Sequence, residues 1–120
     1  MGEIAMESKF ELMHIGINTE SPEEAWKLAM LLSTVFNLTP RHGNKSEFAG
    51  NLFECMKSPF LGTHGHVAMG TEDLEAAVAE LKEKGFAFKM DTAAYNEDGK
   101  LKNIYLDDEF GGLAIHIMQK

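Results

Sequence analysis

The stretch HIGINTESPEEA, residues 14 to 25, decides the fold, because residues 66 to 77 repeat it as HVAMGTEDLEAA. The two stretches share a His, a Thr, two Glu and an Ala at matching positions. A second repeat relates EFAGNLFECMK at 47 to 57 to EFGGLAIHIMQK at 109 to 120. Because the two similarities occur in the same order along the chain, the sequence predicts that its second half duplicates its first.

Each half of the chain begins with a strand followed by a helix. Residues 10 to 18, FELMHIGIN, place three apolar side chains at alternate positions, as in a strand with one buried face. Ser21 is the predicted N-cap of the first helix, and Pro22 is its predicted first residue. In the second half the strand GHVAMG precedes a helix whose predicted N-cap is Thr71.

Short strands follow each helix. Turn-forming residues separate the strand patterns SEFAG and LFECMK in the first half, and a hairpin around Asp98 and Gly99 joins two strands in the second. The predicted fold class is therefore α+β, with two tandem βαβββ modules at about residues 8–60 and 61–120. We expect a single domain, residues 1–120, because this length is ordinary for one domain.

The composition argues against several classes of function. The formal net charge is -8 and no basic run occurs, which disfavours binding to nucleic acid or to an anionic membrane surface. No apolar run is long enough to span a membrane, and the N-terminus carries acids where a signal peptide needs basic residues. We therefore expect a cytoplasmic protein. Cys55, the only cysteine, is expected to be a buried structural thiol.

The repeats single out four polar positions on the predicted strands. His14 matches His66 in the first repeat, and Glu54 matches His116 in the second. In each strand the polar residue alternates with apolar neighbours, so its side chain points away from the apolar face. If the helices cover the apolar faces, the four polar side chains gather on the other side of the sheet.

Such a cluster of three imidazoles and one carboxylate predicts a metal site. A lone buried carboxylate costs several kcal/mol, so these groups need partners. The predicted metal ligands are His14, Glu54, His66 and His116. This donor set suits a divalent Zn, Ni, Mn, Fe or Co ion and leaves the choice among them open. The alternative is a decayed site, in which the polar side chains are retained but no metal binds.

Three further residues are predicted to contact a substrate. Met56 and Met118 share the strand face of the predicted ligands, where they would form an apolar lining or part of an ordinary core. Tyr105 is predicted to form a hydrogen bond with the substrate.

The segments MHIGIN, FECM, GHVAMGTEDLEAAVAELKEKG and LAIHIM resemble the vicinal oxygen chelate superfamily. This superfamily includes glyoxalase I, extradiol dioxygenases, fosfomycin-resistance enzymes, methylmalonyl-CoA epimerase and bleomycin-resistance proteins. The resemblance extends from about residue 10 to the end of the chain and implies a curved mixed sheet around a central cavity. Glyoxalase I has a metal ligand on each of four strands, which correspond by position to His14, Glu54, His66 and His116.

The resemblance implies a metal-dependent lyase or isomerase that acts on a small oxo- or hydroxy-acid or its adduct. The metal would hold two adjacent oxygens of the substrate, and Glu54 or His116 would be the catalytic group that moves a proton. In most of the superfamily the last ligand is a glutamate, where this chain has His116. Glyoxalase I activity would therefore require Glu54 or His116 to act as the base.

Two other functions remain open. One is a non-catalytic module that binds a small molecule or assists a metabolic enzyme. Small domains of the superfamily fused to bacterial keto-hydroxyglutarate or keto-deoxy-phosphogluconate aldolases also end in an AIH-type strand, although this chain is too short for the aldolase barrel, which needs about 200 residues or more. The other is an extradiol-type dioxygenase, because two histidines with Glu54 would form a 2-His-1-carboxylate site for Fe(II). We expect a small-molecule substrate and a homodimer.

Overall fold

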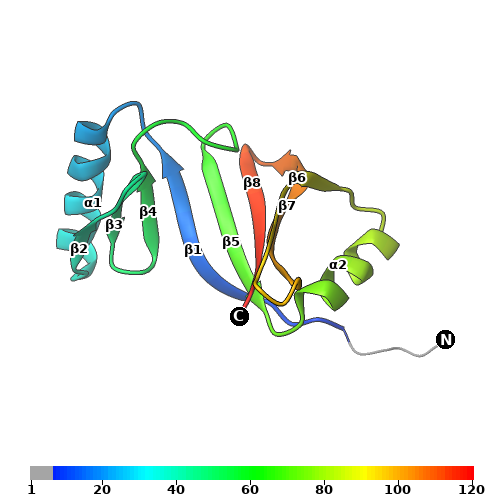
Figure 1. Ribbon diagram of the computed structural model, residues 1–120. Coiled ribbons are helices and arrows are strands. Elements are labelled where there is room, and N and C mark those ends of the chain that lie inside the picture. Colours follow the sequence, from blue (N-terminus) through cyan, green and yellow to red (C-terminus); the bar gives the residue numbers. More distant parts are fainter. Residues whose placement is uncertain (1–6) are drawn as a thin grey trace.

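The computed structural model describes residues 7–120, which form an α+β fold with one mixed eight-stranded sheet and two helices (Figure 1). The elements are, in order, β1 (Glu11–Asn18), α1 (Pro22–Phe36), β2 (Pro40–His42), β3 (Ser46–Ala49), β4 (Phe53–Met56), β5 (Gly65–Thr71), α2 (Leu74–Glu83), β6 (Phe88–Tyr95), β7 (Leu101–Phe110) and β8 (Leu113–Gln119). Neither helix in this part of the chain is both long and apolar enough to cross a membrane.

The strand order in the sheet places β4, β1, β5 and β8 side by side at its centre. The full order is β2-β3-β4-β1-β5-β8-β7-β6. β1 pairs parallel with β4 and antiparallel with β5, and β5 pairs parallel with β8. Helix α1 packs on β3 and β4 towards one end of the sheet, and α2 packs near β7 towards the other (Figure 1). In the sheet, β1 therefore lies between the strands that α1 contacts, β2, β3 and β4, and those that α2 contacts, β5, β8 and β7.

The predicted start of α1 is confirmed. Ser21 is the N-cap, and its side-chain oxygen accepts a hydrogen bond of 3.1 Å from the backbone N–H of Glu24. This bond satisfies one of the backbone donors that every helix N-terminus exposes. The helix ends where Asn37 adopts a left-handed conformation with φ of 57°. The connection from β1 into α1 is thus fixed by local sequence.

The predicted start of α2 is wrong by two residues. The N-cap is Asp73, not Thr71, and its carboxylate accepts a hydrogen bond of 3.1 Å from the backbone N–H of Ala76. Thr71 is instead the last residue of β5, where it pairs with Gln119 of β8. Thr71 has a side chain that could cap a helix, but its pairing with Gln119 keeps it in the strand.

The apolar core lies between the sheet and the helices. The larger cluster packs beneath α2 and contains Leu74, Phe88, Leu101, Ile104 and Ile117. A smaller cluster beneath α1 contains Ala25, Ala29 and Cys55. Burial, together with the nearby Glu47 and Glu54 carboxylates, raises the pKa of the Cys55 thiol to about 11, so Cys55 is a buried structural thiol as expected.

Candidate metal centre

The structure brings the four predicted ligands together on the central strands. His14 lies on β1, Glu54 on β4, His66 on β5 and His116 on β8. The Nε2 atom of His66 is 3.3 Å from Nε2 of His14, and Oε1 of Glu54 is 3.4 Å from His14 Nε2 and 3.3 Å from His66 Nε2. One nitrogen from each of the three histidines lies within 4.8 Å of the others, so the triad could hold a metal ion.

Small residues in the sheet make this convergence possible. In the strand register Gly16 lies between Glu54 and His66, and Ala68 lies between His14 and His116. A Cβ atom on Gly16 would lie only 1.9 Å from Cε1 of His66. The imidazole of His66 therefore occupies the space above Gly16, and any larger residue at that position would displace it. Gly16 is a site residue that the repeats do not single out, because its role depends on His66, which is distant in sequence.

Several buried nitrogen atoms of the cluster have no hydrogen-bond partner. They are Nδ1 of His66 and both ring nitrogens of His116. Burying a polar atom without a partner is unfavourable, and a bound ion is one arrangement that removes this cost. A divalent cation bound to the triad would give His116 a partner for one nitrogen, and neutral imidazole is a preferred ligand for such ions. The residues present therefore fit a metal.

Electrostatics and burial keep Glu54 and His116 in the protonation states that metal ligands require. Contacts with the His14 and His66 rings, assisted by a hydrogen bond from Ser46, hold the pKa of Glu54 well below its ordinary value. Burial, followed by the charges of His66 and His14, lowers the pKa of His116 from 6.5 to about 4. At neutral pH, Glu54 is therefore a carboxylate and His116 is a neutral imidazole, and both can donate a lone pair.

A buried hydroxyl group orients Glu54. Ser46 on β3 is only 2% exposed, and its hydroxyl donates a 2.9 Å hydrogen bond to Oε2 of Glu54. The other oxygen, Oε1, is the one that faces His14 and His66. Ser46 thus occupies one carboxylate oxygen and leaves the other directed towards the histidines, which is a common role for residues that surround metal ligands.

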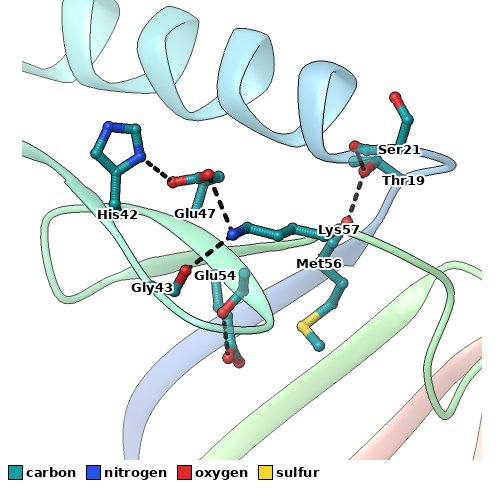
Figure 2. Close-up of polar contacts among 9 residues, drawn as sticks. Thr19, Ser21, His42, Gly43, Glu47, Glu54, Met56 and Lys57 are labelled. Atoms are coloured by element: carbon teal, nitrogen blue, oxygen red, sulfur yellow. Dashed lines mark hydrogen bonds and ion pairs between the residues drawn. The ribbon is translucent and has the colours of Figure 1, made fainter.

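A second polar network lies on the side of β3 and β4 that α1 covers (Figure 2). The buried carboxylate of Glu47 is 2.8 Å from Nδ1 of His42 and 3.5 Å from Nζ of Lys57. Lys57 also donates a 2.9 Å hydrogen bond to the backbone oxygen of Gly43. Because Glu47 follows Ser46 in β3, this network fixes the strand that carries the hydroxyl partner of Glu54.

Tyr105 packs directly against the cluster. Its ring stacks on His116 with centroids 4.3 Å apart and an angle of 1° between the planes. Burial, with the nearby charge of Glu54, raises the pKa of Tyr105 to about 12, so its hydroxyl stays protonated and can donate a hydrogen bond. Tyr105 also lines a cavity of about 520 Å³ that begins beside His116.

The two predicted methionines occupy different surroundings from Tyr105. Met56 is 8% exposed, and its backbone oxygen accepts a 2.6 Å hydrogen bond from the Thr19 hydroxyl, seen in Figure 2. Met118 is half-buried and pairs with Asn103 across β8 and β7. Neither methionine lines the cavity beside His116. The residues that line this cavity are Phe60, Leu61, Lys89, Asp91, Thr92, Asn103, Tyr105 and His116.

Comparisons with known proteins bear on the fold. No protein-family model matches the chain, and no curated protein matches it. Among solved structures, it is similar to the hypothetical protein BH1468 from Bacillus halodurans C-125, with a TM-score of 0.63 and 19% sequence identity. The match covers 93% of this chain and 95% of that protein. At this identity, the similarity shows a shared fold alone.

Proposed function

We propose that the chain is a metal-dependent enzyme of the vicinal oxygen chelate type, a lyase or isomerase for a small oxo- or hydroxy-acid or its adduct. The convergence of His14, His66 and His116, with Glu54 in contact with two of them, is the observation that carries this proposal. The donor set matches Zn, Ni, Mn, Fe or Co.

The proposal includes a duplicated architecture. A strand, a helix and three strands precede residue 57, and the same sequence of elements follows residue 64. The strand order is symmetrical about the β1–β5 pair, with each first strand parallel to the last strand of its own half. This supports two βαβββ modules that each contribute two ligands, with the sheet curving around the site.

The residues have distinct proposed roles. His14 and His66 hold the metal, and Glu54, anchored by Ser46, adds one carboxylate oxygen. When bound, the metal would polarise two adjacent substrate oxygens and make a neighbouring C–H proton acidic. Glu54 or His116 would accept that proton. The pKa of each is lowered in the metal-free chain, so both are weak bases and only a strongly acidified proton would be transferred.

Metal content tests this proposal directly. We expect protein purified without a histidine tag to carry about one divalent ion per chain by elemental mass spectrometry, and His66→Ala to lose it. His64→Ala is the matched control, because His64 is an exposed histidine of the connection before β5 and should leave the metal in place. Protein that binds none of Zn, Ni, Mn, Fe or Co after reloading would contradict the proposal.

The His116→Glu variant tests the type of activity. It places a glutamate, the last ligand in most of the superfamily, at position 116. This position already pairs with Ala68 of β5 in the central part of the sheet. We expect the variant to act on the glutathione adduct of methylglyoxal, measured by absorbance, if residue 116 is what limits glyoxalase activity. A metal-loaded variant that remains inactive on this adduct would assign the natural substrate to another class.

A binding module without turnover is the second candidate. The lowered pKa values of both candidate bases favour it, because a general base works best with a pKa near the working pH. It predicts ligand-induced thermal stabilisation with no product. The contact of Glu54 with two histidines also supports an extradiol-type Fe(II) centre. Protein loaded with Fe(II) anaerobically and then mixed with catechol in aerated buffer would reveal it by oxygen uptake.

A further inference from the structure

The cavity beside His116 has an apolar wall and a cationic group. Phe60 and Tyr105 form an edge-to-face pair with centroids 6.1 Å apart, and Tyr105 continues onto the face of His116. Leu61 completes this apolar part of the lining. Lys89 and Asn103 supply hydrogen-bond donors elsewhere in the same cavity of about 520 Å³.

The strand register places Lys89 in line with the metal centre. Lys89 of β6 pairs with Tyr105 of β7, and Tyr105 pairs with His116 of β8. Directly paired residues present their side chains on the same face of a sheet. Because neighbouring strands lie about 4.8 Å apart, the Cα atoms of Lys89 and His116 are separated by roughly 10 Å. One small molecule can therefore reach both side chains.

Lys89 is a cation without an acidic partner. In residues 7–120, the ion pairs within 4.0 Å involve Lys57, Lys84, Lys120 and histidines, and none involves Lys89. Lys89 is half-buried, whereas the one acid in the cavity lining, Asp91, is exposed. In a chain of net charge -8, a half-buried unpaired ammonium group is a local site for an anion.

We propose that this cavity binds the remote end of the ligand and that this end carries a carboxylate held by Lys89. The ligand's apolar part lies between Phe60 and the Tyr105–His116 stack, and its other end supplies two adjacent oxygens to the metal. A monoanion fits better than a phosphate because Lys89 is the only cation in the lining and Asp91 repels a second negative charge. This inference rests on the proposed function, which places the metal at the other end of the site.

Two probes that differ only in a carboxylate test the inference. Benzohydroxamic acid binds divalent metals through two adjacent oxygens, and 4-carboxybenzohydroxamic acid adds a carboxylate at the opposite end of its ring. We expect the zinc-loaded protein to bind the carboxylated probe about fivefold more tightly by calorimetry, as suits one partly exposed ion pair. Lys89→Met should abolish this preference, and Asp91→Asn should increase it.

The matched control is Lys102→Met. Lys102 is exposed on β7 beside Asn103, so its side chain points to the opposite face of the strand from the cavity. This variant should keep the preference of the native protein. Circular dichroism and a melting curve for each variant establish that the fold is intact, which is expected because none of the three residues is buried.

The outcomes separate this inference from the proposed function. Equal binding of the two probes, or a preference that survives in Lys89→Met, would overturn the carboxylate site while leaving the metal centre supported. If neither probe binds the zinc-loaded protein, the open metal site is wrong and the inference fails with it. A preference that disappears in Lys89→Met and rises in Asp91→Asn supports both.

Discussion

At the scale of single residues, Gly16 leaves open the space that the ring of His66 occupies in the candidate metal site. A Cβ atom there would meet the ring of His66 at 1.9 Å. We expect Gly16→Ala to displace His66 and weaken zinc binding at least about tenfold, as measured by competition with a chelator. Gly70→Ala is the control, because the atoms nearest the added Cβ belong to the side chains of Met13 and Lys120, which are not candidate ligands. Equal affinity for zinc in the Gly16→Ala variant would refute this role.

His116 should also make the metal-free protein sensitive to mild acid. Its pKa is about 4 in the folded chain against 6.5 ordinarily, so the unfolded chain binds the proton more readily. Stability should therefore fall as the pH decreases from 6.5 towards 4. The lowered pKa of Glu54 adds a loss only as the pH falls below about 4.5, so the upper part of the window reports on His116.

Urea unfolding in the presence of a chelator measures this effect at pH 6.5, 5.5 and 4.8. The free energy of unfolding should decrease across this series in the native chain and much less in His116→Gln, whose side chain does not titrate. Other titrating groups are shared by both proteins and cancel in the difference. Parallel pH profiles for the two proteins would show that the His116 ring is equally protonated in the folded and unfolded chains.

At the scale of secondary-structure elements, a residue of β3 orients the candidate ligand Glu54 on β4. Ser46 donates its hydroxyl to Oε2 of Glu54, and the neighbouring Glu47 is tied to His42 and Lys57. We expect Ser46→Ala to weaken zinc binding by about ten- to a hundredfold, because Glu54 loses the bond that orients it. It should also raise the Glu54 pKa, which NMR titration of the metal-free protein can detect.

The conservative variant Ser46→Thr and the distant variant Ser58→Ala provide the controls for this effect. Thr keeps a hydroxyl group and should retain most of the affinity for zinc. Ser58 is exposed in the connection after β4, so its removal should change nothing. If Ser46→Ala binds zinc as tightly as the native chain, the hydrogen bond does not orient the ligand.

The sequence allowed the ligand cluster to be predicted because strand alternation is local. Parity alone put His14, Glu54, His66 and His116 on one face, and the repeat pointed to adjacent strands. The N-cap of α1 was also readable, since Ser21 competes with no other interaction there. These features depend on neighbours within a few residues, for which sequence patterns carry most of the information.

Features that depend on long-range register could not be predicted. Thr71 fits an N-cap by its residue type, and nothing local reveals its pairing with Gln119. The place of Lys89 in the cavity depends on an irregular pairing of β6 with β7, where the register shifts between Lys89 and Ala94. Gly16 gains its importance only from the strand that brings His66 over it. In each case the deciding neighbour is distant in sequence.

At the scale of the whole molecule, exposed apolar side chains in the second half of α1 are a candidate contact in the homodimer that we expect from the sequence. Leu31, Val35 and Phe36 are each more than half exposed, at 58%, 58% and 55%. Exposed apolar side chains grouped on one element often mark an interaction site. We expect light scattering to give the mass of a dimer, and the double variant Leu31→Glu, Val35→Glu to give that of a monomer. Met90→Glu, an equally exposed change on β6, should remain dimeric.

The two halves of the chain meet where β1 pairs with β5, and each half carries two of the four candidate ligands. His14 and Glu54 precede the connection at residues 57–64, and His66 and His116 follow it. If that connection were cut, each fragment would keep two of the four donors, and neither could complete the coordination alone. A metal ion would then act as a cross-link between fragments, and its concentration would set how firmly they reassociate.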